Sequence, residues 1–404
     1  MFEFGPIWRT ILRNKISALL IVIQVSLTLG VISNAAYVIN QRQQKMNITT
    51  GIDETHLFTL SVKPINNAPI KNVDIERDLN HLRQLANVAD ATSVTSVPLV
   101  GGGWSGGVHV GEQGDTDFQS AAADMMAVDS HGLNTLGVNL ASGRFFNEDE
   151  IVECIDARCK FNVVLLSRDL ADALFGKGSN PLGKQLNFAG SHPTIIGITQ
   201  PFYATYLDHS YVNGVLLLPM TNVVASSSTY LVRAKGESRD SLMLQVADEL
   251  RKIDSQRVIG DSVTSSAQKA YAFRNSRLTV TVMQFTIVVV IGITILGIVG
   301  LTSLWVNQRR RQLGIRRALG ATQAAIVRYF LIENLMLTTL GIVIGVGLSL
   351  FINQLMVQHY HVSALPMRYI VVGMFGVWLL GVLAALVPVL RAAAISPALA
   401  TRSV

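Results

Sequence analysis

Residues 309–322 read RRRQLGIRRALGAT, a basic stretch that lies between two long apolar segments. The segments on either side cover residues 278–306 and 329–352, and each is nearly free of charge. A helix of about 20 predominantly apolar residues crosses the roughly 30 Å hydrocarbon core of a bilayer. We therefore predict two transmembrane helices joined by a basic loop of residues 307–328.

Two further segments, residues 16–40 and 369–390, have a similar length and character. Hydrophobic residues make up 50% of the 404-residue chain, and its mean hydropathy is +0.39. Because a long middle stretch is ordinarily polar, the apolar excess is concentrated in these four segments. The sequence predicts an α-helical membrane protein with four transmembrane helices.

The first apolar segment has an alternative interpretation as a secretory signal peptide, because Arg9, Arg13 and Lys15 precede it. The segment is about twice as long as the apolar core of a signal peptide. No clear cleavage site with small residues closes it. We therefore expect this segment to remain as a membrane anchor.

Basic residues gather at one end of the predicted helices. The loop 307–328 carries six arginines and no acid. Since Lys and Arg near the ends of spans are retained in the cytoplasm, this loop and both termini are predicted to be cytoplasmic. Residues 1–15 resemble an amphipathic helix on the inner face of the membrane, and residues 391–404 form a cytoplasmic tail. Residues 41–277 and the short loop 353–368 are placed on the outer side of the membrane, which is called periplasmic below.

The charge balance differs between the two sides. Residues 41–277 carry 21 Lys and Arg against 25 Asp and Glu, whereas the rest of the chain carries 12 against 2. The net charge of +6 is therefore a topology signal and requires no nucleic-acid partner. Arg368, at the outer end of the fourth helix, is an exception that snorkelling to the interface can accommodate. Membrane lipids are the expected surroundings of the four helices.

The periplasmic region mixes strand-like and helix-like segments, which is typical of an α+β domain. We expect two lobes between the first and second transmembrane helices. The glycine-rich residues 101–111 indicate a flexible loop or an insertion at a sheet edge. The predicted strands are residues 57–62, 91–97, 163–166, 185–188, 194–198, 215–218 and 230–234, and the predicted helices are residues 74–85, 168–175 and 239–253.

Both cysteines of the chain, Cys154 and Cys159, lie in the predicted periplasmic region. An oxidising compartment allows a disulfide to persist, and a turn through the four intervening residues brings the two Cα atoms within bonding range. Two buried free thiols are the alternative. No second Cys or His pair lies nearby to complete a metal site.

The stretch 309–322 resembles the coupling segment of MacB/FtsX-type ABC transporter permeases, whose pattern is approximately R-x-x-E-I/L-G-x-x-x-A-L-G-A-T/S. Further pieces resemble the same family in the same order, and the resemblance spans essentially the whole chain, although it is weakest between residues 65 and 130. These pieces are residues 143–146, the helix 167–176 ending in Leu-Phe-Gly, residues 180–184, Pro388, and residues 391–398.

The resemblance implies that a short basic helix docks into an ABC ATPase subunit and transmits force to the spans. ATP and Mg²⁺ would belong to that partner, since no G-x-x-x-x-G-K-S/T motif occurs in this sequence. Gln312 replaces the acid of the family pattern. This departure is consistent with pairing with a non-identical sister subunit that carries the full pattern, and an identical copy is the alternative. The predicted coupling residues are Arg311, Gln312, Gly314, Arg316, Arg317, Ala318, Leu319, Gly320 and Ala321.

Glu333 lies about one turn inside the third span, where an acid is costly unless it is paired. It matches an acid of the family. We expect Arg316, Arg317 or Arg328 to neutralise it, and snorkelling to the interface is the alternative.

Three classes of function follow. The first is a permease that couples ATP hydrolysis to movement of its periplasmic domain and to extrusion of a periplasmic or membrane substrate, with a periplasmic adaptor and an outer-membrane exit duct as further partners. The second is an FtsX-like regulator of a cell-wall hydrolase or a signalling partner. The third, an enzyme, is poorly supported, because the histidines show no catalytic spacing. These scattered histidines include His109, His131, His192 and His209.

Overall fold

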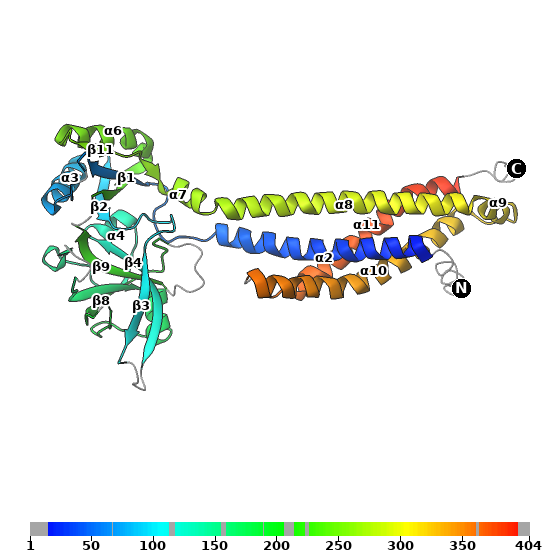
Figure 1. Ribbon diagram of the computed structural model, residues 1–404, viewed down its shortest axis with the longest axis horizontal. Coiled ribbons are helices and arrows are strands. Elements are labelled where there is room, and N and C mark those ends of the chain that lie inside the picture. The colour runs from blue at the N-terminus through cyan, green and yellow to red at the C-terminus, as the bar shows by residue number, and fades with distance from the viewer. Residues whose placement is uncertain are drawn as a thin grey trace. The chain divides into compact units, whose positions relative to one another are not determined.

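A computed structural model describes residues 15–394 (Figure 1), apart from residues 67, 113–117, 155–158, 189, 206–213, 223–225 and 361–362. The amphipathic helix predicted for residues 1–15 therefore lies outside the described residues, except for its last residue. The chain divides into two compact units. The helical unit comprises Met1–Met46 and Ser276–Val404, and the α/β unit comprises Asn47–Asn275.

The helical unit contains the four predicted membrane helices. Each is long and apolar enough to cross a bilayer, and a short helix, α9, lies between the second and third. The large α/β unit is inserted between the first and second, so the predicted fold class is confirmed. The helices are α2 (Lys15–Met46), α8 (Arg274–Gln308), α9 (Arg310–Ala318), α10 (Gln323–Tyr360) and α11 (Met367–Ala393).

Small residues allow α2 and α10 to pack closely. A Cβ atom added to Gly341 would lie 2.7 Å from Val25, and one added to Gly345 would lie 3.1 Å from Leu29. Glycine is therefore required at Gly341, where the two helices approach closely. The helix that approaches α10 at these two positions is α2.

The connection between α10 and α11 differs from the predicted loop of residues 353–368. The helix α10 continues to Tyr360, and α11 begins at Met367. The side chain of Asn353 accepts a hydrogen bond from the backbone N–H of Leu365 at 2.9 Å. This bond ties the connection to α10. The predicted span was shorter than α10 because it counted only the apolar residues, and the helix continues beyond them.

The first lobe of the α/β unit is an antiparallel sheet covered on one face by two helices (Figure 1). Its strand order is β11-β1-β10-β2, and β12 also pairs with β1. Apolar residues of α3 and α6 pack against this sheet. The elements are β1 (Leu57–Pro64), α3 (Asn72–Gln84), β2 (Val88–Val94), β10 (Ser228–Ala234), α6 (Arg239–Ile253), β11 (Arg257–Ile259), β12 (Val263–Thr264) and α7 (Ser265–Ala272).

The second lobe is a mixed sheet with the strand order β3-β4-β9-β7-β8-β5, and β6 pairs with β9. Leu57, Val94 and Leu231 of the first lobe belong to the same buried cluster as residues of the second lobe. The two lobes therefore share a core. The elements are β3 (Trp104–Val110), β4 (Gln119–Val128), α4 (Gly132–Leu136), β5 (Leu140–Gly143), η1 (Glu148–Glu150), β6 (Val152–Cys154), β7 (Val163–Ser167), α5 (Arg168–Phe175), β8 (Thr194–Thr199), β9 (Gly214–Asn222) and η2 (Gly236–Ser238).

One strand prediction in this unit was wrong, and several short or atypical strands, β4 among them, were not predicted. Residues 185–188 form isolated bridges instead of a strand. The strand β4 was missed, because its segment QSAAADMMAV is rich in alanine, which has a low strand propensity. It forms because β3 and β9 pair with it on both sides, so tertiary pairing overrides local propensity.

Candidate coupling surface

The short helix α9 connects the end of α8 to the start of α10 (Figure 1). It ends at Ala318, and two residues later Gly320 has a φ of +96°, a left-handed conformation that favours glycine. The backbone N–H of Ala321 donates to the carbonyl of Arg316 at 3.0 Å, which closes the end of the helix. Thr322 then accepts a hydrogen bond from the N–H of Ala325 and starts α10. The sequence Leu-Gly-Ala-Thr, which resembles the family pattern, thus terminates α9 and initiates α10.

One face of α9 packs against the spans. Leu313 is buried in a cluster with Ile326 and Phe330 of α10 and Val389 of α11. Gly314 is buried beside it. Gly314, predicted as a coupling residue, therefore contributes by packing α9 against the spans.

The opposite face of α9 is exposed. The Leu319 side chain is 84% exposed and Ile315 is 47% exposed. The remaining predicted residues Arg311, Gln312, Arg316, Ala318 and Gly320 are exposed as well, whereas Arg317 and Ala321 are partly buried. This exposed face combines two aliphatic side chains with guanidinium groups. An apolar centre with a charged rim is typical of protein interfaces.

Some of the arginines hold α9 in place and others are free. The guanidinium of Arg316 lies 5.3 Å from the centre of the Tyr329 ring. Arg317 donates to the carbonyl of Ala393 at 3.1 Å. Arg310 and Arg311 are exposed and form no ion pair with any residue that the structure describes. These two cations can therefore engage carboxylates of a partner without breaking an internal contact.

The buried acid Glu333 pairs with Arg309, which corrects the predicted partners Arg316, Arg317 and Arg328. Nη1 of Arg309 lies 3.1 Å and 3.0 Å from the two carboxylate oxygens. The Glu333 side chain is 1% exposed, so snorkelling is wrong too. Arg309 is the residue that connects α8 to α9. The ion pair therefore fixes the joint between α8 and α9.

Sequence reasoning missed a polar network at the junction of the two lobes. Arg83 donates to Asp129 at 2.7 Å, and Nδ1 of His131 lies 2.9 Å from Asp90. Asn134 donates to the same aspartate at 2.5 Å. Burial raises the pKa of Asp90, but the hydrogen bonds from His131 and Asn134 outweigh it, so the pKa lies below its usual value. Acids inside or next to apolar strand segments are the sequence signal that could have indicated this network.

A second missed contact joins the first and last segments of the α/β unit. Nζ of Lys269 in α7 lies 2.8 Å from Glu54 and donates to the carbonyl of Ile48 at 3.0 Å. Thr50 donates to the same glutamate. This cluster ties the segment that enters the α/β unit to the helix that precedes its exit.

In the described part of the chain, the cysteines and the histidines considered as catalytic candidates have separate structural contacts. Cys154 and Cys159 are joined by a disulfide, with their Cα atoms 5.7 Å apart. Among the described residues, no three His, Cys, Asp or Glu side chains are placed to hold a metal ion. His192 and the backbone of His109 both contact Asn187, whereas His131 belongs to the lobe junction, and His209 lies outside the described residues.

Four apolar helices, a large α/β unit after the first of them and an exposed basic turn define a membrane permease with an extracytoplasmic domain. Comparison with protein families agrees. Residues 16–256 match the MacB-like periplasmic core domain, and residues 285–397 match the FtsX-like permease C-terminal domain. The chain belongs to the MacB/FtsX-type family of ABC transporter permeases.

Two individual relatives share less than 30% sequence identity with this chain. The macrolide export ATP-binding/permease protein MacB of Neisseria meningitidis serogroup A is 26% identical over 89% of this chain and 53% of its own length. A probable syringafactin export ATP-binding/permease protein of Pseudomonas syringae pv. tomato is 29% identical over 68% of this chain and 41% of its own. The chain thus spans about half the length of these relatives.

Among solved structures, the periplasmic region of MacB from Actinobacillus actinomycetemcomitans is similar. It has 18% sequence identity and a TM-score of 0.34, and the match covers 56% of this chain and 96% of that structure.

Proposed function

We propose that this chain is the permease subunit of an ABC-type export complex, in which an ATPase partner subunit docks on α9. The observation that carries the proposal is the exposed surface of α9, which bears the 84% exposed Leu319 and the guanidinium groups of Arg310 and Arg311, for which the described residues provide no ion-pair partner. Burying one large aliphatic side chain contributes about 1.5–3 kcal/mol to an interface. Such a face is costly to leave in water, so a partner is expected to cover it.

The proposed topology places α9 and both termini in the cytoplasm and the α/β unit in the periplasm. The six arginines between residues 307 and 328 support this orientation. ATP and Mg²⁺ are proposed to bind the ATPase alone. The stretch that comes nearest to a phosphate-binding loop, residues 178–184, is followed by Gln185 instead of Ser or Thr, and it lies between a helix and a strand.

The proposed action is a transmitted movement. Closure of the ATPase dimer displaces α9, and the packing of Leu313 and the Arg309–Glu333 pair transfer that displacement to α10 and α8. The α/β unit, inserted between α2 and α8, responds and drives a periplasmic or membrane substrate onward. The relatives named for macrolide and syringafactin export support a role in efflux, and an adaptor and an outer-membrane duct are proposed partners.

A second permease, identical or a sister subunit, completes the proposed assembly. The helix α8 offers a surface for it. Only 17% of the residues in its most apolar stretch are buried inside this chain, compared with 50% of those in the corresponding stretch of α2. Phe285, Val288 and Leu296 are among its exposed side chains. Their exposure supports contact with a second subunit within the bilayer.

The test is co-purification of the full chain with its ATPase from membranes. Leu319→Glu is expected to lower the affinity of the complex at least about 30-fold, as loss of a central interface side chain does, and Gly320→Val to uncouple ATP hydrolysis. Leu244→Glu is the matched control, because Leu244 is a 76% exposed leucine on α6. Unchanged co-purification and ATPase activity of Leu319→Glu would remove the docking role of α9.

A further inference from the structure

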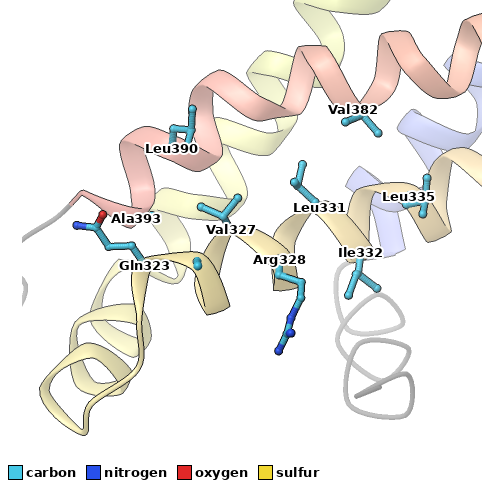
Figure 2. A pocket seen from close by; sticks show the side chains of 10 residues that line it. Gln323, Val327, Arg328, Leu331, Ile332, Leu335, Val382, Leu390 and Ala393 are labelled. Carbon is cyan, nitrogen blue, oxygen red and sulfur yellow. The ribbon is translucent and has the colours of Figure 1, made fainter. Parts of the chain in front are cut away.

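A groove of about 620 Å³ lies between the first turns of α10 and the last turns of α11 (Figure 2). Its volume falls within the roughly 300–1,000 Å³ of small-molecule sites. Figure 2 shows Val327 and Leu331 projecting from α10 toward α11. None of the described residues that line the groove is acidic. The lining residues are Gln323, Ala324, Val327, Arg328, Leu331, Ile332, Leu335, Val382, Leu390 and Ala393.

The polar lining is confined to one end of the groove. Arg328 directly precedes the apolar run of α10, and Gln323 is the first residue of that helix. The other end, toward Leu335 and Val382, lies in the membrane-spanning part of the two helices. The groove thus runs from the level of the membrane interface into the hydrocarbon, with its cation at the interface.

Two arginines at this level lack a hydrogen-bond or ion-pair partner among the described residues. Arg328 and Arg391 are both exposed, and neither forms an ion pair or hydrogen bond with a residue that the structure describes. Arg391 directly follows Leu390, which lines the groove. Glu333, the nearby acid, is already occupied by Arg309. The positive charge beside the groove is therefore available to an external anion.

We propose that this groove binds one anionic phospholipid, from the leaflet at the α9 end of the helices. An acyl chain lies along Val327, Leu331 and Leu390, and the phosphate contacts Arg328 at the interface. Charge complementarity favours this occupant, because basic pockets between transmembrane helices select anionic head groups. A second copy of the chain would leave Arg328 facing an identical, equally basic groove.

The lipid would contact the start of α10, directly after the turn that ends α9. Gln323, at one end of the groove, is the first residue of α10 and follows the turn at Gly320–Thr322. A lipid seated there links the position of α10 to that of α11 in this leaflet. This inference concerns lipid binding to the chain itself and does not depend on an ATPase.

The experiment uses the full chain purified in neutral detergent and titrated with phosphatidylglycerol or with phosphatidylcholine of the same acyl chains. Native mass spectrometry measures the bound lipid, and the thermal unfolding midpoint measures its stabilising effect. We expect phosphatidylglycerol to bind about fivefold more tightly, since one arginine near an anionic head group has about that effect.

Three variants separate charge from cavity. Arg328→Gln is expected to abolish the preference for phosphatidylglycerol, and Ala324→Trp, which fills the groove, to reduce the binding of both lipids. Arg368→Gln is the matched control, because Arg368 is exposed at the other end of α11, and it is expected to retain the preference.

Several outcomes would overturn the proposal. Equal preference in the wild type and in Arg328→Gln would show that the arginine does not select the head group. Glycerol phosphate that stabilises the chain as much as the whole lipid does would reduce the site to an anion site. Unchanged lipid binding by Ala324→Trp, together with loss of an oligomer, would make the groove an interface between copies. Increased binding after removal of residues 1–14 would identify that segment as the occupant.

Discussion

The two units of the molecule bury polar groups in different ways. In the α/β unit, the fully buried Asp78 pairs with both terminal nitrogens of Arg257 and accepts a hydrogen bond from Tyr230 at 2.8 Å. In the helical unit, hydroxyls and amides join the helices, as in the contact between Thr28 and Thr294 at 2.7 Å. Hydrogen bonds between membrane helices contribute only about 0.6 kcal/mol each on average.

The difference indicates where each unit is fixed and where it can move. Paired charges make the arrangement inside the α/β unit expensive to change, because separating them leaves a buried charge. The helices α2 and α10 rely on close packing at glycines instead. The ion pair between Arg309 and Glu333 lies at the joint of α8 and α9. In the helical unit, this buried ion pair therefore lies where the ATPase is proposed to act on the spans. We call it the lock of this joint.

The largest effect is expected in the α/β unit. Asp78→Ala leaves Arg257 buried without its carboxylate and Tyr230 without its acceptor, which should lower the free energy of unfolding by about 3–5 kcal/mol. Limited proteolysis of the full chain during a thermal ramp measures the change. Asp74→Ala is the control, because Asp74 pairs with Arg77 at the surface, and a loss below about 1 kcal/mol is expected there. Similar losses in both variants would contradict the role assigned to burial.

The joint of the coupling helix should respond next. Glu333→Gln leaves Arg309 without a counter-charge, and we expect a cost of about 3 kcal/mol, at the low end for a broken buried ion pair. Trypsin cleavage after Arg310 and Arg311 should become faster. The double variant Arg309→Gln with Glu333→Gln removes both charges and should recover part of the loss. A double variant as sensitive to trypsin as Glu333→Gln would show that the ion pair is not the lock.

The disulfide tests a covalent constraint in the α/β unit. Closing a loop of this length between Cys154 and Cys159 stabilises a protein by about 2 kcal/mol in the chain-entropy model. Cys154→Ser with Cys159→Ser should lower the thermal midpoint, and thiol labelling of the wild type should require prior reduction. Full labelling of the wild type without a reductant would contradict the bond.

The smallest effect is a pH dependence of the lobe junction. The pKa of Asp90 is lowered in the folded state, so its ionised form stabilises the protein above its ordinary value of 3.8. This contribution is lost as the pH falls from that value through the lower folded pKa. Unfolding measured between pH 7 and pH 3 should show a steeper acid limb for the wild type than for Asp90→Asn. Equal slopes would show that the junction does not titrate.

Local features of the sequence were predicted well. The helices α5 and α6 match residues 168–175 and 239–253, because their apolar spacing and end residues are sequence properties. The strand β4 failed for the opposite reason, since its alanines carry little strand propensity and the neighbouring strands supply the pairing. The motif predicted a set of coupling residues, and only the structure shows which of them are exposed and which face the spans. Their role in coupling stays a prediction.

The sequence by itself determined the four spans, the inserted α/β unit and the helix stop at Gly320. These features depend on the hydrophobicity of consecutive residues and on one glycine at positive φ, so local sequence is sufficient to specify them. Only the tertiary structure decided that Arg309 neutralises Glu333 and that Asp90 and Asp129 meet Arg83 and His131 at the lobe junction. Six arginines lie between 5 and 24 residues before Glu333 along the chain, and the most distant of them forms the pair. The helix rotation and packing that bring one guanidinium within reach depend on contacts between segments far apart in sequence.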